Sequence, residues 1–403
     1  MITERSCRAC HAELETILAM GTMHPSNFLR PDQTPLPKVP FDLSACTRCH
    51  LVQLRYTVEP DLMFRQYWYQ SGINETMRAE LASIVRQARG LVGTLTPSDL
   101  VIDIGANDGT LLAIYTEEPD HPQRVAYEPA ENLWETLRPH TEILIPSYFP
   151  APGLDIQKAK IITSIACFYD LDHPAAFVEA IKAALHPQGI WIVQLQDWDQ
   201  MQKATAFDNI CMEHLCYYSL GSIERLIAPF GLEIIHAETR AINGGSYRLI
   251  IGHTGAWHVD DTVESIRFRE AGCDDWTTFD RFAWRARAAQ TQIHAAVDQL
   301  RLRGPVDAYG ASTKFNTLAQ WCELDHTKLR QAWERSPEKW GLRTIGTDIP
   351  IVSEADGRAD PPAALIAGIW QFRDAVLNRE ADFLASGGVI LFPLPRVDLV
   401  SHA

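Results

Sequence analysis

Short apolar segments separated by amphipathic stretches recur through the middle of the chain. Residues 100–105 form an apolar run interrupted by one acid, and residues 125–128, 159–165 and 189–194 form similar runs. Runs of this length are typical of buried parallel strands. Helical spacing of apolar residues occurs between them, for example at 175–185. This alternation predicts a doubly wound α/β sheet whose ligand lies at the carboxyl ends of the strands.

The same alternation returns in the last third of the chain and predicts a second α/β unit. Residues 240–248 place a Gly-Gly turn between two strand-like runs, which would close the first sheet. A charged stretch with helical spacing follows as far as Arg303, and residues 306–314 then repeat the order of strand, small-residue turn and helix start. Two more strand-like runs, at 364–369 and 389–392, favour a second Rossmann-like domain.

Two Cys-x-x-Cys pairs lie in the first fifty residues, Cys7 with Cys10 and Cys46 with Cys49. Each pair can wrap one side of a tetrahedral ion, and four thiolates complete a closed, structural zinc site. The 35 residues between the pairs contain five prolines, so we expect little regular structure there and a large contribution of the metal to folding. A redox role is disfavoured because neither pair follows a strand in a βαβ pattern.

The cysteine pairs mark a first domain ahead of the two α/β units. Ordinary reduced cysteines are the alternative to a metal site, and the flanking His11 and His50 are alternative ligands. Several domains are expected because 403 residues exceed one ordinary hydrophobic core. We predict a zinc-binding domain at 1–70, an α/β domain at 71–255 and a second α/β domain at 256–403.

Composition narrows the partners that this chain can have. Apolar residues make up 46% and charged residues 22%, as in ordinary globular proteins. The apolar runs stay shorter than the roughly 18–20 residues that cross a bilayer, and the first ten residues lack the apolar centre of a secretory signal. Acidic residues outnumber basic ones 51 to 36, and the formal charge of −15 opposes binding to nucleic acid. We expect a cytoplasmic protein without a membrane or nucleic-acid partner.

The loop after the first strand-like run has the spacing Asp103-x-Gly105-x-x-x-Gly109. This spacing differs from the Gly-x-Gly-x-x-Gly dinucleotide fingerprint, so a nicotinamide enzyme is the weaker alternative. Glycines let the backbone approach a ligand closely, and the N-terminus of the following helix favours a carboxylate. The methionine carboxylate of S-adenosylmethionine fits this position.

A second strand-like run ends in Glu128, beyond the glycine loop. An acid at this point can accept hydrogen bonds from both ribose hydroxyls of a bound nucleoside. The loop and this acid, in this order and spacing, predict a methyl-donor site. Its predicted residues are Asp103, Gly105, Asn107, Asp108, Gly109, Glu128, Pro129 and Ser164.

Glu213 and His214 are adjacent in the sequence, and two tyrosines follow them closely. Histidine is the side chain best suited to move a proton near neutral pH. In an extended or loop conformation, neighbouring side chains diverge, so the two can approach one substrate from different angles. A packed histidine beside a solvated glutamate is the alternative, and only the surrounding sequence favours catalysis.

The strand-like run at the start of the second α/β unit leads into another small-residue loop. Its backbone amides and polar side chains can hold phosphates at the start of a helix. The sequence therefore predicts a second ligand-binding loop, on the scale of a nucleotide. The predicted residues are Tyr309, Gly310, Ser312, Thr313 and Lys314.

With these motifs in order, the sequence resembles the three-domain S-adenosylmethionine-dependent C-methyltransferases that act on nucleotide-linked 4-keto-6-deoxy sugars. The resemblance covers nearly the full length, and the motifs are specific jointly rather than singly. They are the two Cys-x-x-Cys pairs and the segments Tyr67–Gly72, Asp103–Gly109, Glu213–His214, Asn243–Ser246, Tyr309–Lys314 and Gly346–Ile351.

The resemblance implies methylation of sugar C3 in deoxysugar biosynthesis, by a monomer or small homo-oligomer. A ketone at C4 acidifies the C3 proton, and the family match nominates His214 as the base that removes it. The resulting enediolate attacks the methyl group of the donor and releases S-adenosylhomocysteine. Glu213 would orient the histidine or bind a sugar hydroxyl, and Tyr67 or Tyr69 would cover the sugar. Asn243 is a candidate donor to the oxyanion.

The sequence departs from the family pattern near the predicted base. Some members carry a tyrosine two residues before the glutamate, where this chain has Cys211. If that tyrosine assists proton transfer, Tyr217, Tyr218 or Tyr169 must replace it here. The histidine that some members carry after the fourth strand is also missing, and His173 lies five residues too far along the chain.

Two other functions remain as alternatives. An O- or N-methyltransferase for a sugar or small metabolite would use the same donor without forming a carbanion. A zinc-ribbon interaction protein is disfavoured because the chain is acidic and lacks a basic stripe with interleaved aromatic residues. The sequence leaves the nucleotide open among dTDP, GDP, CDP and UDP.

Overall fold

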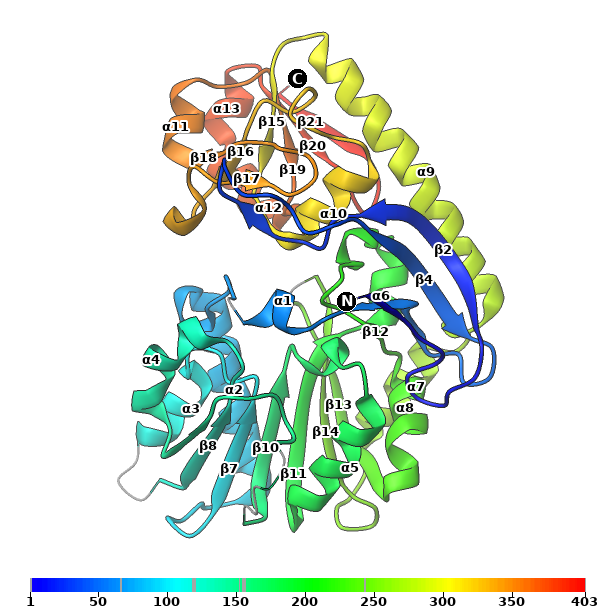
Figure 1. The fold of residues 1–403 in the computed structure, drawn as a ribbon, viewed down its shortest axis with the longest axis vertical. Helices are drawn as coiled ribbons and strands as arrows, with labels where there is room; N and C mark the ends of the chain where they lie inside the picture. Colours follow the sequence, from blue (N-terminus) through cyan, green and yellow to red (C-terminus); the bar gives the residue numbers. More distant parts are fainter. Residues whose placement is uncertain are drawn as a thin grey trace.

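The computed structural model describes residues 2–65, 67–117, 121–151, 153, 157–242 and 244–402. Two α/β bodies lie one above the other along the long axis, and an N-terminal sheet lies beside the junction between them (Figure 1). The sequence-based expectation of two Rossmann-like sheets with a separate N-terminal module is confirmed. The predicted boundaries at residues 70 and 255 stay a prediction.

The central sheet is mostly parallel and closes with an antiparallel pair. Among the described residues its order is β13-β14-β11-β10-β7-β8-β9, with β14 antiparallel to both of its neighbours. This places the Gly-Gly turn between the last two strands, as predicted. The strands are β7 (Leu100–Ile104), β8 (Gln123–Tyr127), β9 (Ile143–Ile145), β10 (Ala159–Ile165), β11 (Leu185–Gln196), β13 (Leu232–Arg240) and β14 (Ser246–His253).

Helices cover both faces of this sheet, which explains the continuous apolar runs. On one face, Leu81 and Ile84 pack in the same cluster as Val101 and Ile161 of the strands. On the other face, α5 contributes to the larger core of the molecule. The helices of this part of the chain are α2 (Glu75–Val92), α3 (Thr110–Ile114), α4 (Trp134–Leu137), α5 (Pro174–Ala184), α6 (Trp198–Lys203), α7 (Leu220–Ile227) and α8 (Asp261–Arg269).

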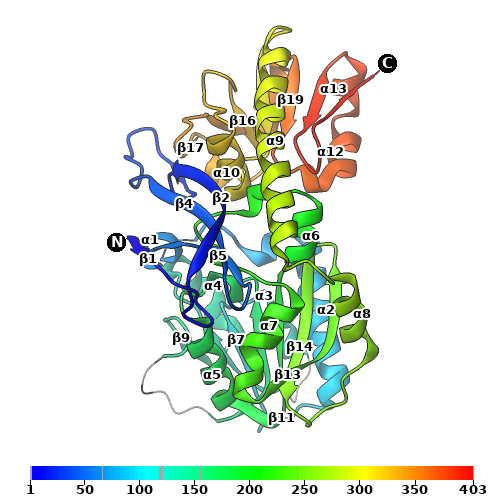
Figure 2. The ribbon, with the colours of Figure 1, turned by 90° about the vertical axis from the view of Figure 1, so that its right-hand side faces the viewer.

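The C-terminal body is a second α/β sheet of order β18-β16-β15-β19-β20-β21, parallel except for its last strand. The long helix α9 contacts this sheet and also the N-terminal sheet, so it ties the two together (Figure 2). The strands are β15 (Val306–Tyr309), β16 (Ala332–Glu334), β18 (Ile351–Ser353), β19 (Ala364–Ala367), β20 (Val389–Phe392) and β21 (Asp398–Ser401). The helices are α9 (Trp276–Arg301), α10 (Thr313–Trp321), α11 (Glu354–Ala359), α12 (Arg373–Arg379) and α13 (Ala381–Ala385).

The stretch between the cysteine pairs is more regular than the sequence predicts. Strands β2 (Leu14–Met23) and β4 (Val39–Cys46) form an antiparallel pair with a buried apolar face, so the expectation of little regular structure is wrong. Most of the prolines lie in the connection between the two strands. Pro40 lies in β4 opposite Thr22, next to a register shift, which is a position where a strand tolerates proline.

The N-terminal sheet contains one strand from a distant part of the chain. Its order is β12-β5-β4-β2, and β12 (Cys216–Tyr217) pairs with β5 (Val52–Leu54). A shorter pair joins β3 (Phe28–Leu29) to β17 (Arg343–Thr344) of the C-terminal body. The N-terminal part of the chain is therefore joined by backbone pairing to both α/β bodies.

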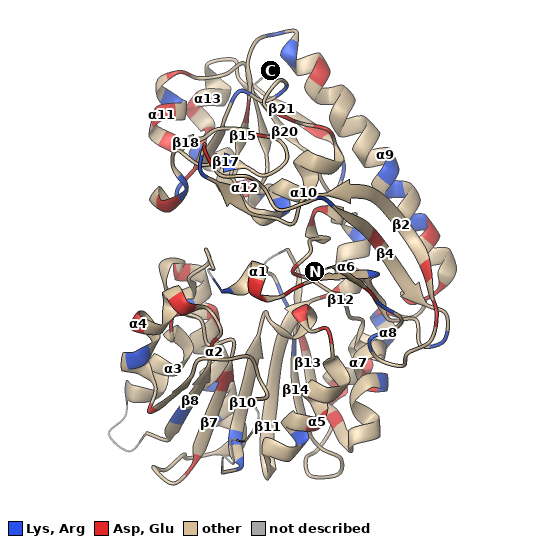
Figure 3. Cartoon of the chain, viewed as in Figure 1, with Lys and Arg blue, Asp and Glu red and all other residues tan. Residues whose placement is uncertain are grey.

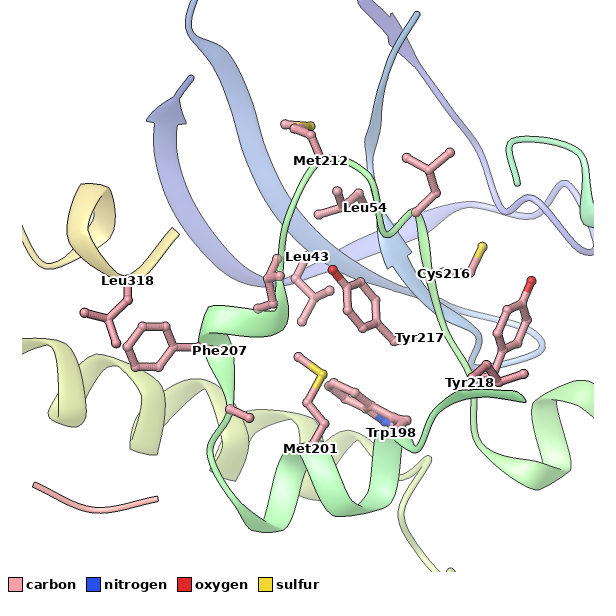
Figure 4. Close-up of a cluster of buried hydrophobic side chains, with 14 of the residues drawn as sticks. Leu43, Leu54, Trp198, Met201, Phe207, Met212, Cys216, Tyr217, Tyr218 and Leu318 are labelled. Carbon is pink, nitrogen blue, oxygen red and sulfur yellow. The ribbon is translucent and has the colours of Figure 1, made fainter. Parts of the chain in front are cut away.

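One apolar core fills the junction of the three parts. Leu43 and Leu54 come from the N-terminal sheet, Trp198 and Phe207 from the segment that follows β11, and Leu318 from α10 (Figure 4). All five side chains are almost completely buried. Since their burial requires all three parts, the arrangement of the parts is fixed by packing as well as by strand pairing.

Charged side chains lie mainly on the outer helices, and both signs are present along α9 (Figure 3). The strands at the centres of the sheets are largely uncharged, in keeping with their burial. Within the described part of the chain, every helix is too short or too polar to cross a membrane.

Candidate active site

A cavity of about 720 Å³ lies at the carboxyl ends of the central parallel strands. This is the position that a doubly wound sheet predicts for its ligand. All three parts of the molecule line it. The central domain contributes the ends of β7, β8, β10 and β11, the N-terminal part contributes residues between 60 and 71, and the C-terminal body contributes residues 312–314 and 369–372.

The loop after β7 is held by Glu128 at the end of β8. Its carboxylate accepts hydrogen bonds from the backbone N–H groups of Asn107 at 2.7 Å and Ala130 at 2.8 Å. Burial raises the pKa of Glu128, and these two N–H groups oppose the shift. A carboxylate has about four acceptor positions, so two remain for ribose hydroxyls. The donor set therefore fits the nucleoside part of S-adenosylmethionine.

Gly105 lines the cavity with a backbone φ of +70°, which an L side chain rarely adopts. A Cβ at this position would also lie 3.3 Å from the Cys167 side chain. The beginning of the loop is thus open to a ligand because it has no side chain. Pro129 also lines the cavity, whereas Gly109 and Ser164 lie outside its wall. Ser164 is fully buried in β10 and accepts a hydrogen bond from Trp191.

Asn107 and Asp108 connect the cofactor loop to the segment that carries Tyr69. The Asn107 side chain accepts a hydrogen bond from the Ser71 N–H at 2.9 Å, and Asp108 accepts one from the Gly72 N–H at 2.6 Å. Asp108 does not line the cavity. Its contacts therefore indicate that it positions the 69–72 segment, while Asn107 both holds this segment and lines the cavity.

Asp103 is a buried acid at the end of β7 and lines the cavity. Thr163 on β10 donates a hydrogen bond to it at 2.6 Å. Burial raises the pKa of Asp103 to about 7, and the charge of Glu128 adds to the shift while Thr163 opposes it. A cationic ligand in the cavity would favour the ionised form of this carboxyl group. The positively charged methyl donor is a ligand of that kind.

His214 lines the same cavity as the cofactor loop. Its Nδ1 is 3.2 Å from the backbone oxygen of Asn209, and since a carbonyl can only accept, Nδ1 carries the proton. The ring packs edge-on against Tyr169, with centroids 4.3 Å apart. Burial lowers the pKa of His214 to about 3, and the charge of Lys314 contributes to the shift. The imidazole is therefore neutral, with the lone pair on Nε2.

Two buried carboxyl groups accompany this histidine. Glu213 lies behind the cavity wall, and Asp170 lines the cavity from the short helix η5 (Phe168–Asp170), which follows β10. Each has a carboxyl oxygen without a hydrogen-bond partner among the described residues. Burial raises the pKa of Glu213 to about 7, and burial together with the charge of Glu213 raises the pKa of Asp170. The sequence reasoning missed Asp170, although its place just after a strand that carries ligand-facing residues was a signal.

The two tyrosines of the segment Tyr67–Gly72 also lie at the cavity. Tyr67 and Tyr69 both line it, and burial followed by the charge of Asp170 raises the pKa of Tyr67. Tyr169 is the one candidate replacement for the missing family tyrosine that lines the cavity, since Tyr217 and Tyr218 lie behind the wall. His173 lines the outer part with a largely exposed side chain. The predicted oxyanion donor Asn243 lies outside the described residues.

The loop of the C-terminal body contributes its helix start to the cavity. Ser312, Thr313 and Lys314 line it, and the Ser312 hydroxyl caps α10 by accepting from the Phe315 N–H at 3.1 Å. Helix N-termini of this kind bind anions. Tyr309 is 1% exposed and lies behind the wall, as does Gly310. Three of the five predicted substrate residues are therefore brought to the cavity.

The four predicted metal ligands lie together, away from the cavity. Their sulfur atoms lie within 4.8 Å of one another, with Cys7 to Cys49 at 3.5 Å and Cys10 to Cys46 at 3.4 Å. Tetrahedral Zn–S bonds of about 2.3 Å place sulfurs about 3.8 Å apart, so the geometry fits zinc. His50 is directed elsewhere, with Nδ1 2.8 Å from the backbone oxygen of Asp274. The donor set is therefore four thiolates, which leaves no open position for chemistry.

Arg8 links this cluster to the active-site loop. It lies between the first two cysteines, is 4% exposed, and donates to Asp172 at 3.2 Å and to Thr57 at 2.8 Å. Thr57 in turn donates to the same carboxylate at 2.7 Å. Asp172 lines the cavity two residues after Asp170. The cysteine cluster thus supports the loop that carries Tyr169 and Asp170.

Replacing Glu128 by glutamine is expected to weaken binding of S-adenosylhomocysteine by about 1–3 kcal/mol, or roughly 5- to 150-fold. The amide replaces one acceptor oxygen by a donor, so it cannot hold the loop and accept both ribose hydroxyls. Isothermal titration with S-adenosylhomocysteine measures the effect. Glu131→Gln, on the solvent side of the same segment, is the control. Unchanged affinity of the Glu128 variant would remove this residue from the cofactor site.

Replacing Glu213 by glutamine is expected to stabilise the protein at pH 8 and not at pH 5. The carboxyl group is buried, and its pKa rises from 4.5 to about 7. The stabilisation that its protonated form contributes is present below pH 4.5 and is lost as the pH rises through about 7. At pH 8 the variant avoids burying a charge and should gain about 2 kcal/mol. Urea unfolding at both pH values tests this, with the exposed Glu264→Gln as control.

Comparisons with known proteins agree with the geometry. Three family models match consecutive segments: a zinc binding domain at residues 7–64, a methyltransferase domain at 73–237 and a C-methyltransferase C-terminal domain at 241–395. The C-methyltransferase NovU of Streptomyces niveus is 28% identical over 414 residues, covering 98% of this chain and 96% of that protein.

Solved structures are similar to less than half of this chain, at low identity. An S-adenosylmethionine-dependent methyltransferase from Clostridium acetobutylicum is 10% identical with a TM-score of 0.35, over 44% of this chain and 92% of that one. The plantazolicin methyltransferase BpumL in complex with SAH is 10% identical with a TM-score of 0.36, over 43% and 82%. With all three domain models in order along it, the chain belongs to the C-methyltransferases that combine a zinc-binding, a methyltransferase and a C-methyltransferase C-terminal domain.

Proposed function

We propose that this enzyme transfers a methyl group from S-adenosylmethionine to C3 of a nucleotide-linked 4-keto-6-deoxy sugar. The observation that carries the proposal is one continuous cavity of about 720 Å³ lined by the Glu128 loop, the neutral His214 and the N-terminus of α10. These three features suit a nucleoside cofactor, a carbon acid and a phosphate group, respectively. The full-length similarity to NovU, itself a C-methyltransferase, supports transfer to carbon.

The cofactor supplies an electrophilic methyl group when bound. Glu128 and Asn107 hold its nucleoside part, Gly105 leaves room for it, and the ionised Asp103 balances its positive charge. Tyr67 and Tyr69 reach the cavity from the N-terminal side and exclude water from the sugar.

His214 is the proposed base. Its Nδ1–H is held by the Asn209 carbonyl, so Nε2 is the atom that accepts the C3 proton. Removal of this proton leaves an enediolate, and its C3 then bonds to the transferred methyl group. Glu213 and Asp170 are buried carboxyl groups of this region, and burial favours their neutral forms. Four cysteine thiolates hold a structural zinc ion and take no part in the chemistry.

A panel of nucleotide sugars tests the substrate class. With S-adenosylhomocysteine present, dTDP-, GDP-, CDP- and UDP-linked sugars are added to the full-length protein, and thermal unfolding is followed. A ligand at about 100 times its dissociation constant adds roughly 2.7 kcal/mol of stability. We expect such a response to one nucleotide and none to the matching free sugars. No response to any nucleotide sugar would refute the substrate class.

Isotope exchange tests the reaction type. In deuterated water, the enzyme with S-adenosylhomocysteine should exchange the C3 proton of a 4-keto substrate without methylating it. With the active donor, NMR should locate the new methyl group on carbon. A methyl group on oxygen or nitrogen, with C3–H retained throughout turnover, would establish the O- or N-methyltransferase alternative.

A further inference from the structure

Lys314 lies in the first turn of α10 and lines the same cavity as His214. The sequence assigns it to phosphate binding, together with Ser312 and Thr313. The helix N-terminus already offers backbone N–H groups and two hydroxyls to an anion, so phosphate binding does not require the lysine. The Lys314 side chain is half-buried, and its charge acts on the histidine.

The position of Lys314 is fixed by contacts between α10 and the segment that precedes His214. Helix α10 packs against the short helix η6 (Phe207–Asn209). Thr317 of α10 donates to the Ile210 carbonyl at 3.0 Å. The residue that orients the imidazole, Asn209, belongs to this same η6 segment. The lysine and the histidine are therefore carried by one packed unit.

The counter-charge of Lys314 is Asp208 on η6. Asp208 is 1% exposed and accepts from Trp370 Nε1 at 2.8 Å. Burial lowers the pKa of Lys314, and the charges of Asp208 and Cys211 oppose this shift. The titratable groups of this region come from four segments. The segment of His214 itself carries Asp208, Cys211 and Glu213, and the loop after β10 carries Tyr169 and Asp170. The N-terminal part adds Tyr67, and α10 adds Lys314.

Among these groups Lys314 is the cation, and it neighbours the proposed base. A base that removes a proton from the carbon beside a ketone sends the C–H electron pair into the new C3–C4 double bond. The carbonyl pair moves onto O4, so the developing negative charge lies two atoms from the carbon that faces the base. A cation beside the imidazole can reach this oxygen.

We propose that Lys314 is a catalytic residue whose ammonium group binds the substrate oxygen on which negative charge develops while His214 removes the neighbouring proton. This rests on the proposed function. The proton moves from C3 to Nε2 of His214, and the O4 pair returns to re-form the carbonyl as C3 bonds to the methyl group. The lysine gains and loses no proton, and α10 amides, Ser312 and Thr313 remain for phosphate.

The test compares Lys314→Met with Lys328→Met, which removes an ammonium group from the same domain outside the cavity. Lys328 pairs with Asp298 at 2.9 Å. For Lys314→Met we expect a 100- to 1,000-fold loss of kcat, the range for removing one oxyanion donor. The KM for the nucleotide sugar should stay within threefold, and the C3–H exchange rate should fall with kcat. The Lys328 variant should match the wild type.

A second measurement determines the pKa of His214. NMR titration of 15N-histidine-labelled protein, with His214→Gln for assignment, should show a higher His214 pKa in Lys314→Met. A merely structural defect would leave this pKa unaltered or broaden many signals, and affinity for S-adenosylhomocysteine confirms that both variants fold. A raised KM with unchanged kcat and exchange would overturn the proposal in favour of phosphate binding. If the wild type exchanges no C3 proton in any nucleotide 4-keto sugar, the proposed function fails instead.

Discussion

His214→Gln is expected to lower kcat by about 1,000-fold, within the 10²–10⁴ range of general base catalysis. Glutamine keeps a polar side chain of similar length but has no nitrogen lone pair that can take a proton. The wild-type imidazole is held by Asn209 through Nδ1 and packed against Tyr169, so its Nε2 has a defined direction. Steady-state rates with the nucleotide sugar found by the binding panel measure the loss.

The same variant should bind the cofactor normally, because His214 takes no part in the hydrogen bonds that hold the Glu128 loop. Titration with S-adenosylhomocysteine checks this. His186→Gln, on β11 and outside the cavity wall, is the matched control and should keep full activity. A His214 variant with more than a tenth of wild-type kcat would show that another group, such as Tyr169, removes the proton.

Cys46→Ser is expected to abolish zinc binding and to destabilise the N-terminal sheet by several kcal/mol. Structural zinc contributes about 10–16 kcal/mol of apparent binding free energy in small zinc domains, and serine is a poor replacement for a thiolate. Cys46 is fully buried at the end of β4, and its sulfur accepts from the N–H groups of Arg48 and Cys49 at 3.3 Å. Metal analysis and urea unfolding measure the two effects.

The control is Cys216→Ser, a buried cysteine in β12 of the same sheet that lies outside the cluster. It should keep its zinc. Because Arg8 joins the cluster to Asp172, we also expect the Cys46 variant to lose activity together with its metal. A Cys46 variant that retains zinc and stability would refute a four-thiolate structural site.

Features that depend on neighbouring residues were predictable from the sequence. The cofactor loop and Glu128 each follow a strand that the apolar runs predict. The bounds of these two strands in the structure agree with the predicted runs within a few residues. The cysteine pairs were recognisable because each Cys-x-x-Cys motif spans only four consecutive residues. The regular β2–β4 pair was missed, because prolines confined to its connection were taken as typical of the whole stretch.

Contacts between distant segments were not predictable in this way. Asp108 appears in the sequence as a cofactor ligand, and only the folded chain shows that it holds the Gly72 backbone. Asp170 joins Glu213 because the loop after β10 packs beside the segment before β12. Two residues 43 positions apart become neighbours through the packing of non-adjacent segments, which no local pattern records.

The sequence by itself therefore determined the three-part order of the chain, and it predicted the cofactor loop, the cysteine ligands and the candidate base. The tertiary structure alone decided which of the candidate residues share a cavity, with Lys314 and His214 among them. The physical reason is that local propensity and spacing act over a few residues. The docking of α10 on η6, by contrast, depends on burial of a core shared by all three parts.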